Sequence, residues 1–542
     1  MRDSLERVCW WTFVTCITCM CVFGSGPATA QQDAACRDEV PRVDKYEFLR
    51  AASLDLRGVV PTIEEYEALA DLEDVPMDWL EEWTRGEAYA ARVVRRHRAL
   101  LWSNVSNLRL LDGDYGLSSF RARPAGEPSF DIYLRNSGGA TTAYRGRRGQ
   151  RCDPVPAIFD AMGQVVCETR LEMGVEVCVE GYVMVTPYWA PEEPIAVCAF
   201  DAQTAELSAS EIPCAETSRA GDPSCGCGEN MKWCSLGARD VDLRKALAED
   251  VDRRVAAHVI ADEPYYELLS GRRAFLNGPL QFWWTEQAQH YDNLPLTPGV
   301  IDEETAPDMD PTDWDTWEEI TLPEHHSGLL TSPVFLLRFQ TNRARADRFY
   351  DAFLCQPFQP PAAGLPVIDD EQARDPDLQT RAGCNYCHAL LEPAAAHWGR
   401  WMQQGGGYLD PDVYEDISDE CRRCGMGAFS CSSACRQHYL TRTYSPRQEP
   451  YLGMLRAYEF LREEHYDNVE MGPAKLVREA VADDRFPQCS VRRTAEWLFG
   501  RGLRDDEAPW VSEVSAEFYG GDFRYRELSL AVVGSETYRR VR

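Results

Sequence analysis

The stretch that organises this chain is Cys384-Asn385-Tyr386-Cys387-His388, the only Cys-x-x-Cys-His motif among its 542 residues. In the chemistry that this pattern serves, two thiols add across the two vinyl groups of haem, and the histidine that follows ligates the iron. All three side chains must therefore lie on one face of the chain. The motif predicts one covalent haem c bound by Cys384, Cys387 and His388, with His388 as the metal ligand.

The same two cysteines permit other interpretations. They could form a structural disulfide, or a redox-active pair of the thioredoxin type. The thioredoxin type requires a βαβ setting, and the sequence around residue 384 shows no such pattern. The structural disulfide stays open as the alternative.

Composition and charge exclude one class of partner. Hydrophobic residues make up 44% of the chain, enough for packed cores, and the formal net charge is -32. Such a negative charge repels the phosphate backbone of nucleic acids and anionic lipid surfaces. We therefore expect no nucleic-acid partner, whereas a redox partner protein with a basic surface would suit this chain.

The first thirty residues have the pattern of a secretory signal peptide. Arg2 and Arg7 precede an apolar stretch over residues 8–23, and Ala28-Thr29-Ala30 matches an A-x-A cleavage signal. No later stretch approaches the roughly twenty apolar residues that cross a bilayer, so the mature chain is expected to have no transmembrane span. The expected location is the periplasm or the cell surface, or outside the cell, where disulfides persist.

Region 31–150 is predicted to be helical at its start. Asp44 and Thr62 each precede a Glu by three residues, the spacing of a capping box at a helix N-terminus. Helical apolar spacing continues to residue 111. Residues 112–150 are rich in Gly, Arg and Ser with little periodicity, which predicts an irregular connector.

Region 151–240 is predicted to be a small β insertion, because its stretches of β-branched and aromatic residues alternate with turns. It carries eight cysteines, namely Cys152, Cys167, Cys178, Cys198, Cys214, Cys225, Cys227 and Cys234. An exported protein favours disulfides here, and a cysteine-rich metal site is the alternative.

A second cysteine-rich insertion is predicted at 411–445. Its four cysteines are Cys421, Cys424, Cys431 and Cys435, and their spacing would suit either two disulfides or a tetrahedral zinc site. Disulfides are again favoured. Fifteen cysteines remain after those of the signal peptide and the haem motif are set aside, and an odd number leaves one without an intramolecular partner.

Several blocks of this sequence resemble segments of one protein family and follow one another in the same order as in that family. Residues 329–338 (LLTSPVFLLR), 354–361 (LCQPFQPP), the haem motif, and two C-terminal blocks at 484–493 (DRFPQCSVRR) and 525–540 are similar to segments of the planctomycete-type cytochrome C multidomain proteins. The helix, turn and helix at 54–65 (LDLRGVVPTIEE) resemble the start of the same family. The similarity covers roughly residues 241–400 and 470–542 and leaves the first cysteine-rich insertion outside.

The resemblance implies a mostly helical, secreted, haem-carrying protein of a family without an established reaction. One departure bears on the iron. The family usually continues with Met-Asp-Pro after the haem motif, whereas this chain has Leu391-Glu392-Pro393, and a leucine cannot ligate iron. A distal ligand would then have to come from another residue, and the chemically able candidates are His397, Met402, Met426 and Met454.

The predicted fold class is mainly α and multidomain. Helical domains at 241–350 and 446–542 flank a cytochrome-c-like haem segment at 351–410. The predicted function is that of an exported monohaem cytochrome, which transfers electrons if both axial positions of the iron are filled and acts as an enzyme if one is open. The alternative is a disulfide-stabilised extracellular binding or scaffold protein without haem.

Overall fold

A computed structural model describes residues 42–540 except for 106–109, 112, 125, 127, 136–150, 173–174, 215–218, 220, 238, 289–300, 302–305, 360–373 and 404. Val43–Arg542 groups into one compact unit, so the domain boundaries predicted inside it stay predictions. The predicted signal peptide at 1–30 lies outside the described residues, as does Cys36.

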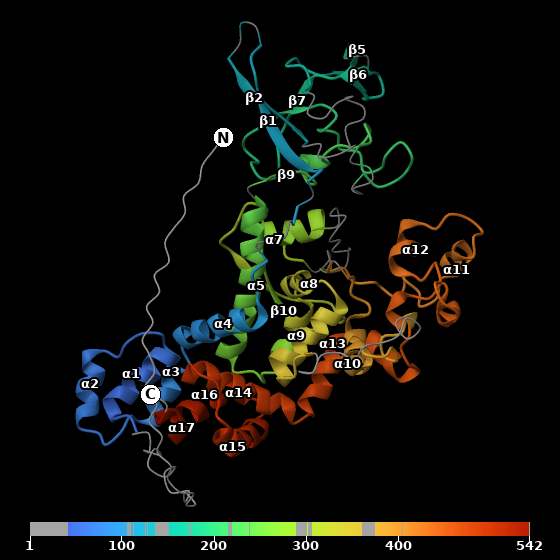
Figure 1. Cartoon of the computed structure of the whole chain (residues 1–542). Helices are drawn as coiled ribbons and strands as arrows, with labels where there is room; N and C mark the ends of the chain where they lie inside the picture. Colours follow the sequence, from blue (N-terminus) through green and yellow to red (C-terminus); the bar gives the residue numbers. More distant parts are fainter. Residues whose placement is uncertain are drawn as a thin grey trace, which may run out of the picture. The chain divides into compact units, whose positions relative to one another are not determined.

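The chain from residue 45 to 101 is helical, as predicted (Figure 1). Its helices are α1 (Lys45–Leu56), α2 (Ile63–Ala70), α3 (Met77–Trp83) and α4 (Glu87–Leu101). Asp44 caps α1 by accepting from two backbone N–H groups, and Thr62 forms the predicted capping box with Glu65 at α2. Such caps satisfy N–H groups that the helix itself cannot.

The prediction of an irregular connector over 112–150 is wrong, because two segments of it form strands. β1 (Gly116–Ala122) and β2 (Phe130–Arg135) pair antiparallel and lie next to each other in Figure 1. They form the middle of a five-stranded sheet of order β7-β8-β2-β1-β9, with β7 (Tyr182–Val185), β8 (Ile195–Cys198) and β9 (Ser235–Leu236). The connector prediction failed because Arg, Asp and Ser lie between the buried residues and lower the local content of β-branched and aromatic residues, which is the usual signal of a strand.

The first cysteine-rich segment therefore shares a sheet with residues that precede it, and the fold is more mixed than the predicted mainly α class with a small β insertion. Two separate hairpins also lie in this segment, β3 (Ile158–Phe159) with β4 (Val165–Val166), and β5 (Glu168–Glu172) with β6 (Val175–Val179). The predicted β character of the segment is confirmed.

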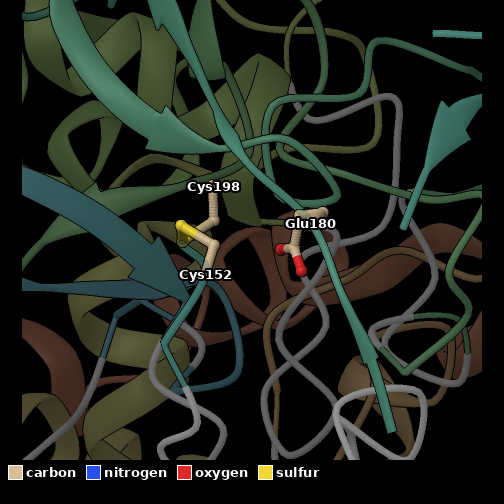
Figure 2. Close-up of side chains that lie close together, drawn as sticks. All are labelled: Cys152, Glu180 and Cys198. Atoms are coloured by element: carbon tan, nitrogen blue, oxygen red, sulfur yellow. A yellow bond between two sulfur atoms is a disulfide. The ribbon is translucent and has the colours of Figure 1, made fainter. Parts of the chain in front are cut away.

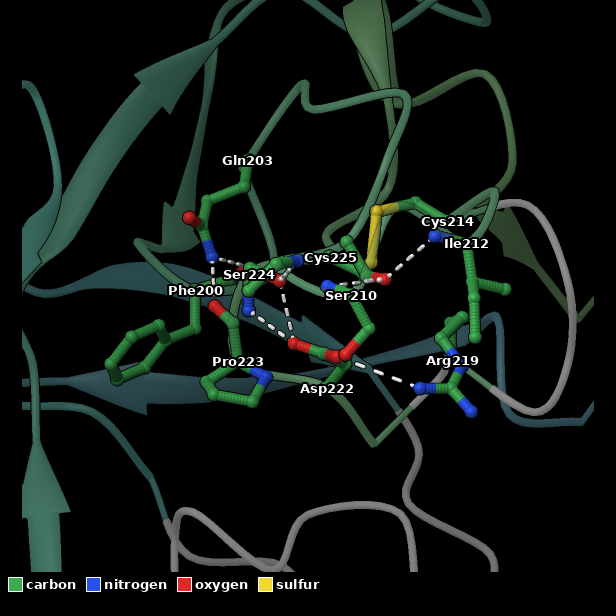
Figure 3. Close-up of a disulfide and its surroundings, with 12 residues drawn as sticks. Phe200, Gln203, Ser210, Ile212, Cys214, Arg219, Asp222, Pro223, Ser224 and Cys225 are labelled. Atoms are coloured by element: carbon green, nitrogen blue, oxygen red, sulfur yellow. Dashed lines mark hydrogen bonds and ion pairs between the residues drawn. A yellow bond between two sulfur atoms is a disulfide. The ribbon is translucent and has the colours of Figure 1, made fainter.

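The eight cysteines of this segment form four disulfides, as predicted. The pairs are Cys152–Cys198, Cys167–Cys178, Cys214–Cys225 and Cys227–Cys234. Around the third pair the loop is held by polar contacts, in which the Asp222 carboxylate accepts from the backbone and the hydroxyl of Ser224 and lies 3.9 Å from Arg219 (Figure 3).

The middle of the chain contributes the 23-residue helix α5 (Arg239–Ala261), which packs against α4. Its buried Asp250 and Arg254 form an ion pair at 2.7 Å, and Asp250 also accepts from the backbone of Phe275. In the part of the chain that the structure describes, no helix combines the length and the apolar character needed to cross a membrane.

One hydrophobic core joins α1 to α17 (Glu536–Arg539), since buried residues from Phe48 to Tyr538 belong to a single cluster. The elements between α5 and the haem motif are α6 (Glu267–Ser270), β10 (Arg273–Asn277), α7 (Gly278–Phe282), η4 (Trp283–Gln287), β11 (Trp317–Thr321), η6 (Gly328–Thr331), α8 (Pro333–Arg338) and α9 (Asn342–Leu354). The motif itself begins α10 (Asn385–Ala395), which continues into η8 (Ala396–Trp398).

The C-terminal part is helical, as predicted. Its larger elements are α11 (Asp419–Gly425), α12 (Ser433–His438), α13 (Glu463–Val481), α14 (Arg485–Phe499), α15 (Ala508–Gly520), α16 (Tyr525–Gly534) and α17 (Glu536–Arg539). Shorter 3-10 turns are η3 (Glu229–Met231), η9 (Pro446–Tyr451), η10 (Arg456–Tyr458) and η11 (Asp505–Glu507). A long-range disulfide, Cys355–Cys489, joins the end of α9 to α14.

Candidate functional site

The haem motif occupies the first turn and a half of α10. Cys384 is the N-cap residue, and Cys387 and His388 follow three and four positions later. Residues at these spacings lie on the same side of a helix. Both cysteines and His388 are half-buried, whereas Tyr386, between them in sequence, is exposed. The helix therefore presents the three predicted site residues on one partly covered face.

Cys384 and Cys387 are the free cysteines among the described residues. The other fourteen described cysteines form seven disulfides, which include Cys355–Cys489 and, in the second cysteine-rich insertion, Cys421–Cys435 and Cys424–Cys431. In that insertion the prediction of two disulfides is confirmed over the zinc alternative. The motif thiols are thus two nucleophiles held one helical turn apart, and they do not form the disulfide of the alternative interpretation.

The imidazole of His388 is held by a carboxylate one turn further along the same helix. Its Nδ1 lies 2.6 Å from Oε1 of Glu392, and the same oxygen accepts from Nε of Arg343 in α9, also at 2.6 Å. A hydrogen bond at Nδ1 leaves Nε2 as the nitrogen that can ligate a metal. Neither Glu392 nor Arg343 is among the functional residues predicted from the sequence, although the four-residue spacing from His388 to Glu392 could have indicated Glu392.

Packing fixes the C-terminal half of α10. Leu391, Ala394 and Ala395 are buried on its inner side, and the helix contacts α9 and α13. Beyond the helix, the indole N–H of Trp398 donates to the carbonyl of Leu330 at 3.0 Å. This burial holds the motif turn on a rigid support, which a covalent cofactor site requires.

Arg345 of α9 fastens the segment that follows α10. Its guanidinium is fully buried and donates to backbone carbonyls on both sides, including those of Phe339 at 2.9 Å, Met402 at 2.8 Å and Gly405 at 2.9 Å. Buried carbonyls need such donors, because an unpaired polar group in the interior is costly. Helix α9 therefore supports α10 at one point and the chain after it at another.

The four distal-ligand candidates differ in their surroundings. His397 is buried with Nδ1 3.0 Å from the carbonyl of Gly472, where a φ of 62° interrupts α13, and burial lowers the pKa of His397 to about 4. Met402 is buried, Met454 is half-buried, and Met426 is 64% exposed. His397 is thus already engaged through one ring nitrogen.

A pocket of about 370 Å³ adjoins α10, and Glu392, Met402 and His438 are among the residues that line it. Of the described residues, the lining includes neither of the motif cysteines nor His388. Of the four distal-ligand candidates, Met402 lines this pocket together with Glu392, and His397, Met426 and Met454 are not in its lining.

The donor set fits a covalent haem. Two unpaired thiols and an imidazole with Nε2 available lie on one partly exposed face of α10, which is the chemistry that thioether attachment and axial ligation need. Cys384 and Cys387 would hold the porphyrin, and His388 would hold the iron.

A second group of potential ligands lies in the β segment. Sγ of Cys152, Sγ of Cys198 and a carboxylate oxygen of Glu180 lie within 4.8 Å of one another (Figure 2). The two sulfur atoms are bonded to each other, so they offer no thiolate to a metal. This group is a buried disulfide beside a buried carboxyl side chain, and it supports the disulfide prediction for the segment.

No protein-family model, no curated protein and no solved structure matches this chain. The resemblance to the planctomycete-type cytochrome C multidomain proteins therefore stays a prediction from the sequence blocks.

Proposed function

We propose that this chain is an exported, monohaem c-type cytochrome-like protein that transfers electrons. The observation that carries the proposal is that the two free cysteines of the described chain are those of the Cys-x-x-Cys-His motif, on one face of α10 with His388. When bound, haem supplies an iron that cycles between two oxidation states.

The chain's own residues perform distinct tasks in this proposal. The thiol groups of Cys384 and Cys387 would add across two vinyl groups, so that each S–H bond and each C=C π bond is replaced by a C–S and a C–H bond and nothing is released. His388 supplies Nε2 to the iron, because its Nδ1 is engaged by Glu392. The seven disulfides are typical of a protein that folds in an oxidising compartment, which supports export to the periplasm, the cell surface or the medium.

The net charge of -32 supports a basic redox partner, since opposite charges steer association. Whether the protein only transfers electrons or also acts on a small molecule depends on the sixth iron ligand. Among the four candidates for that ligand we favour Met402, because it lines the same pocket as Glu392, whereas Nδ1 of His397 already lies 3.0 Å from the carbonyl of Gly472.

Paired cysteine variants test the proposal. The protein is exported from a host that has c-type maturation machinery, and its intact mass is measured. We expect Cys384→Ser/Cys387→Ser to lose the added mass of haem, and the control Cys424→Ser/Cys431→Ser to keep it. His388→Ala should keep the covalent haem and change the iron spectrum. Haem that remains covalently bound to the first variant would contradict the assignment of the thiols.

The second candidate function is a disulfide-stabilised binding or scaffold protein without haem. It is favoured by one observation, namely that the pocket beside α10 is bordered by polar side chains such as Gln379 and Glu459 and not by the motif residues. Under this function the wild-type chain would carry no added mass in the same experiment.

A further inference from the structure

Glu392 connects two charged or ionisable groups through one atom. Its Oε1 lies 2.6 Å from Nδ1 of His388 and 2.6 Å from Nε of Arg343. The side chains of His388 and Glu392 are about one-fifth exposed, whereas that of Arg343 is half exposed. The histidine and the carboxylate are thus mostly covered, whereas the arginine that contacts the carboxylate is partly in solvent.

Both contacts are fixed by secondary structure. His388 and Glu392 are one turn apart in α10, so the helix itself sets their distance. Arg343 lies in the first turn of α9, and α9 packs along α10. The three groups therefore form a chain, imidazole to carboxylate to guanidinium, that does not depend on a loop.

A carboxylate at Nδ1 has two consequences for a histidine that ligates a metal through Nε2. It keeps the proton on Nδ1 and fixes the plane of the ring, and it makes the imidazole a stronger electron donor. Stronger donation favours the oxidised, more highly charged iron over the reduced iron. A carboxylate partner should therefore lower the reduction potential, one of the properties that the protein sets through hydrogen bonds around the axial ligand.

Arg343 acts in the opposite direction. Because it donates to the same oxygen that accepts from His388, it draws negative charge from that oxygen. The guanidinium therefore limits how far Glu392 can increase the electron donation of the imidazole.

We propose that Glu392 is the positioning residue that orients His388 and lowers the reduction potential of its iron, and that Arg343 moderates this effect. The inference rests on the proposed function, because it requires haem at Cys384 and Cys387. It adds a specific control of the potential by two residues that lie outside the Cys-x-x-Cys-His motif.

Redox titration of the haem-loaded protein tests the inference. Dithionite serves as reductant, ferricyanide as oxidant, and the midpoint is read from the absorption spectrum with mediators present. We expect the midpoint to rise in Glu392→Gln, which keeps the size of the side chain and removes its charge. The midpoint should fall in Arg343→Gln, and Glu392→Asp should return it part of the way toward the wild type.

The matched control is Glu459→Gln. Glu459 lines the same pocket as Glu392 but accepts from Gln448 at 2.9 Å and not from His388. The midpoint potential of Glu459→Gln should move by less than half of the shift seen in Glu392→Gln. Equal shifts in the two variants, or a midpoint in Glu392→Gln that stays or falls, would overturn the inference.

Intact mass distinguishes a failure of this inference about Glu392 from a failure of the proposed haem-binding function. Covalent haem in every variant, without the expected shifts in midpoint, overturns the role of Glu392 and leaves the proposed function standing. A wild-type chain without covalent haem overturns both.

Discussion

Removal of the Cys355–Cys489 disulfide should destabilise the protein more than removal of any short-range disulfide. This bond closes a loop of 134 residues and joins α9, which supports the haem motif, to α14. A matched control is Cys424–Cys431, which closes a loop of only 7 residues. In each pair one cysteine is buried and the other is half-buried, so the loss of sulfur packing is similar.

The magnitude follows from the entropy that each cross-link removes from the unfolded chain. With the loop lengths of 134 and 7 residues, chain entropy gives about 5 kcal/mol for the long loop and about 2.4 kcal/mol for the short one at 25 °C. The difference of about 2.6 kcal/mol is more reliable than either value, because the constant part of the entropy cancels. We therefore expect Cys355→Ala/Cys489→Ala to be the less stable variant by that amount.

Urea unfolding of both double-alanine variants, followed by tryptophan fluorescence, measures the difference. The slope of each transition reports whether the same surface is exposed on unfolding. Equal losses in the two variants, or a larger loss in Cys424→Ala/Cys431→Ala, would refute the reasoning, because the length of the closed loop would then not control the stabilisation.

Three further predictions concern the core. Burial lowers the pKa of His97 to about 3, so this histidine contributes stability above its unfolded pKa of 6.5 that is lost as pH falls toward 3. Between pH 7 and pH 5 the free energy of unfolding in urea should therefore fall by about 2 kcal/mol less in His97→Gln than in the wild type, and equal falls would contradict the assignment. Asp250→Asn should cost about 3–5 kcal/mol in the same assay, because it leaves a buried arginine without its charged partner, and a loss below 1 kcal/mol would argue against the ion pair. Gly278→Ala should strongly lower the melting temperature, because the added Cβ would overlap the backbone oxygen of Asp310. The control Gly502→Ala has open space around it and should change the free energy of unfolding by no more than about 0.5 kcal/mol, so similar melting temperatures of the two variants would contradict the close approach at Gly278.

Local patterns in the sequence predicted those parts of the fold that depend on neighbouring residues. The capping box of Thr62 and Glu65 specifies a helix start within four residues, and the structure confirms it. The dense cysteines of residues 152–234 likewise predicted disulfides, because an exported chain with many nearby thiols oxidises them.

The features that the sequence did not predict involve contacts between residues distant in sequence. Strands β1 and β2 pair with each other over six residues, but Ser, Arg and Asp between their buried positions hid the alternation, and their outer edges pair with β9 and β8, which lie far along the chain. The partner of Cys355 lies 134 residues away, and no local pattern could select it among the other cysteines. Arg343 reaches Glu392 across the packing of two helices, so the sequence pointed to His388 and not to the groups that hold it.

The most direct test of the central claim is an absorption spectrum of the wild-type chain, oxidised and reduced, together with its intact mass after export from a host with c-type maturation machinery. We predict a sharp reduced α band and the added mass of one haem, both lost in Cys384→Ser/Cys387→Ser. A colourless protein at the mass of the polypeptide alone would contradict the claim and favour the disulfide-stabilised binding protein.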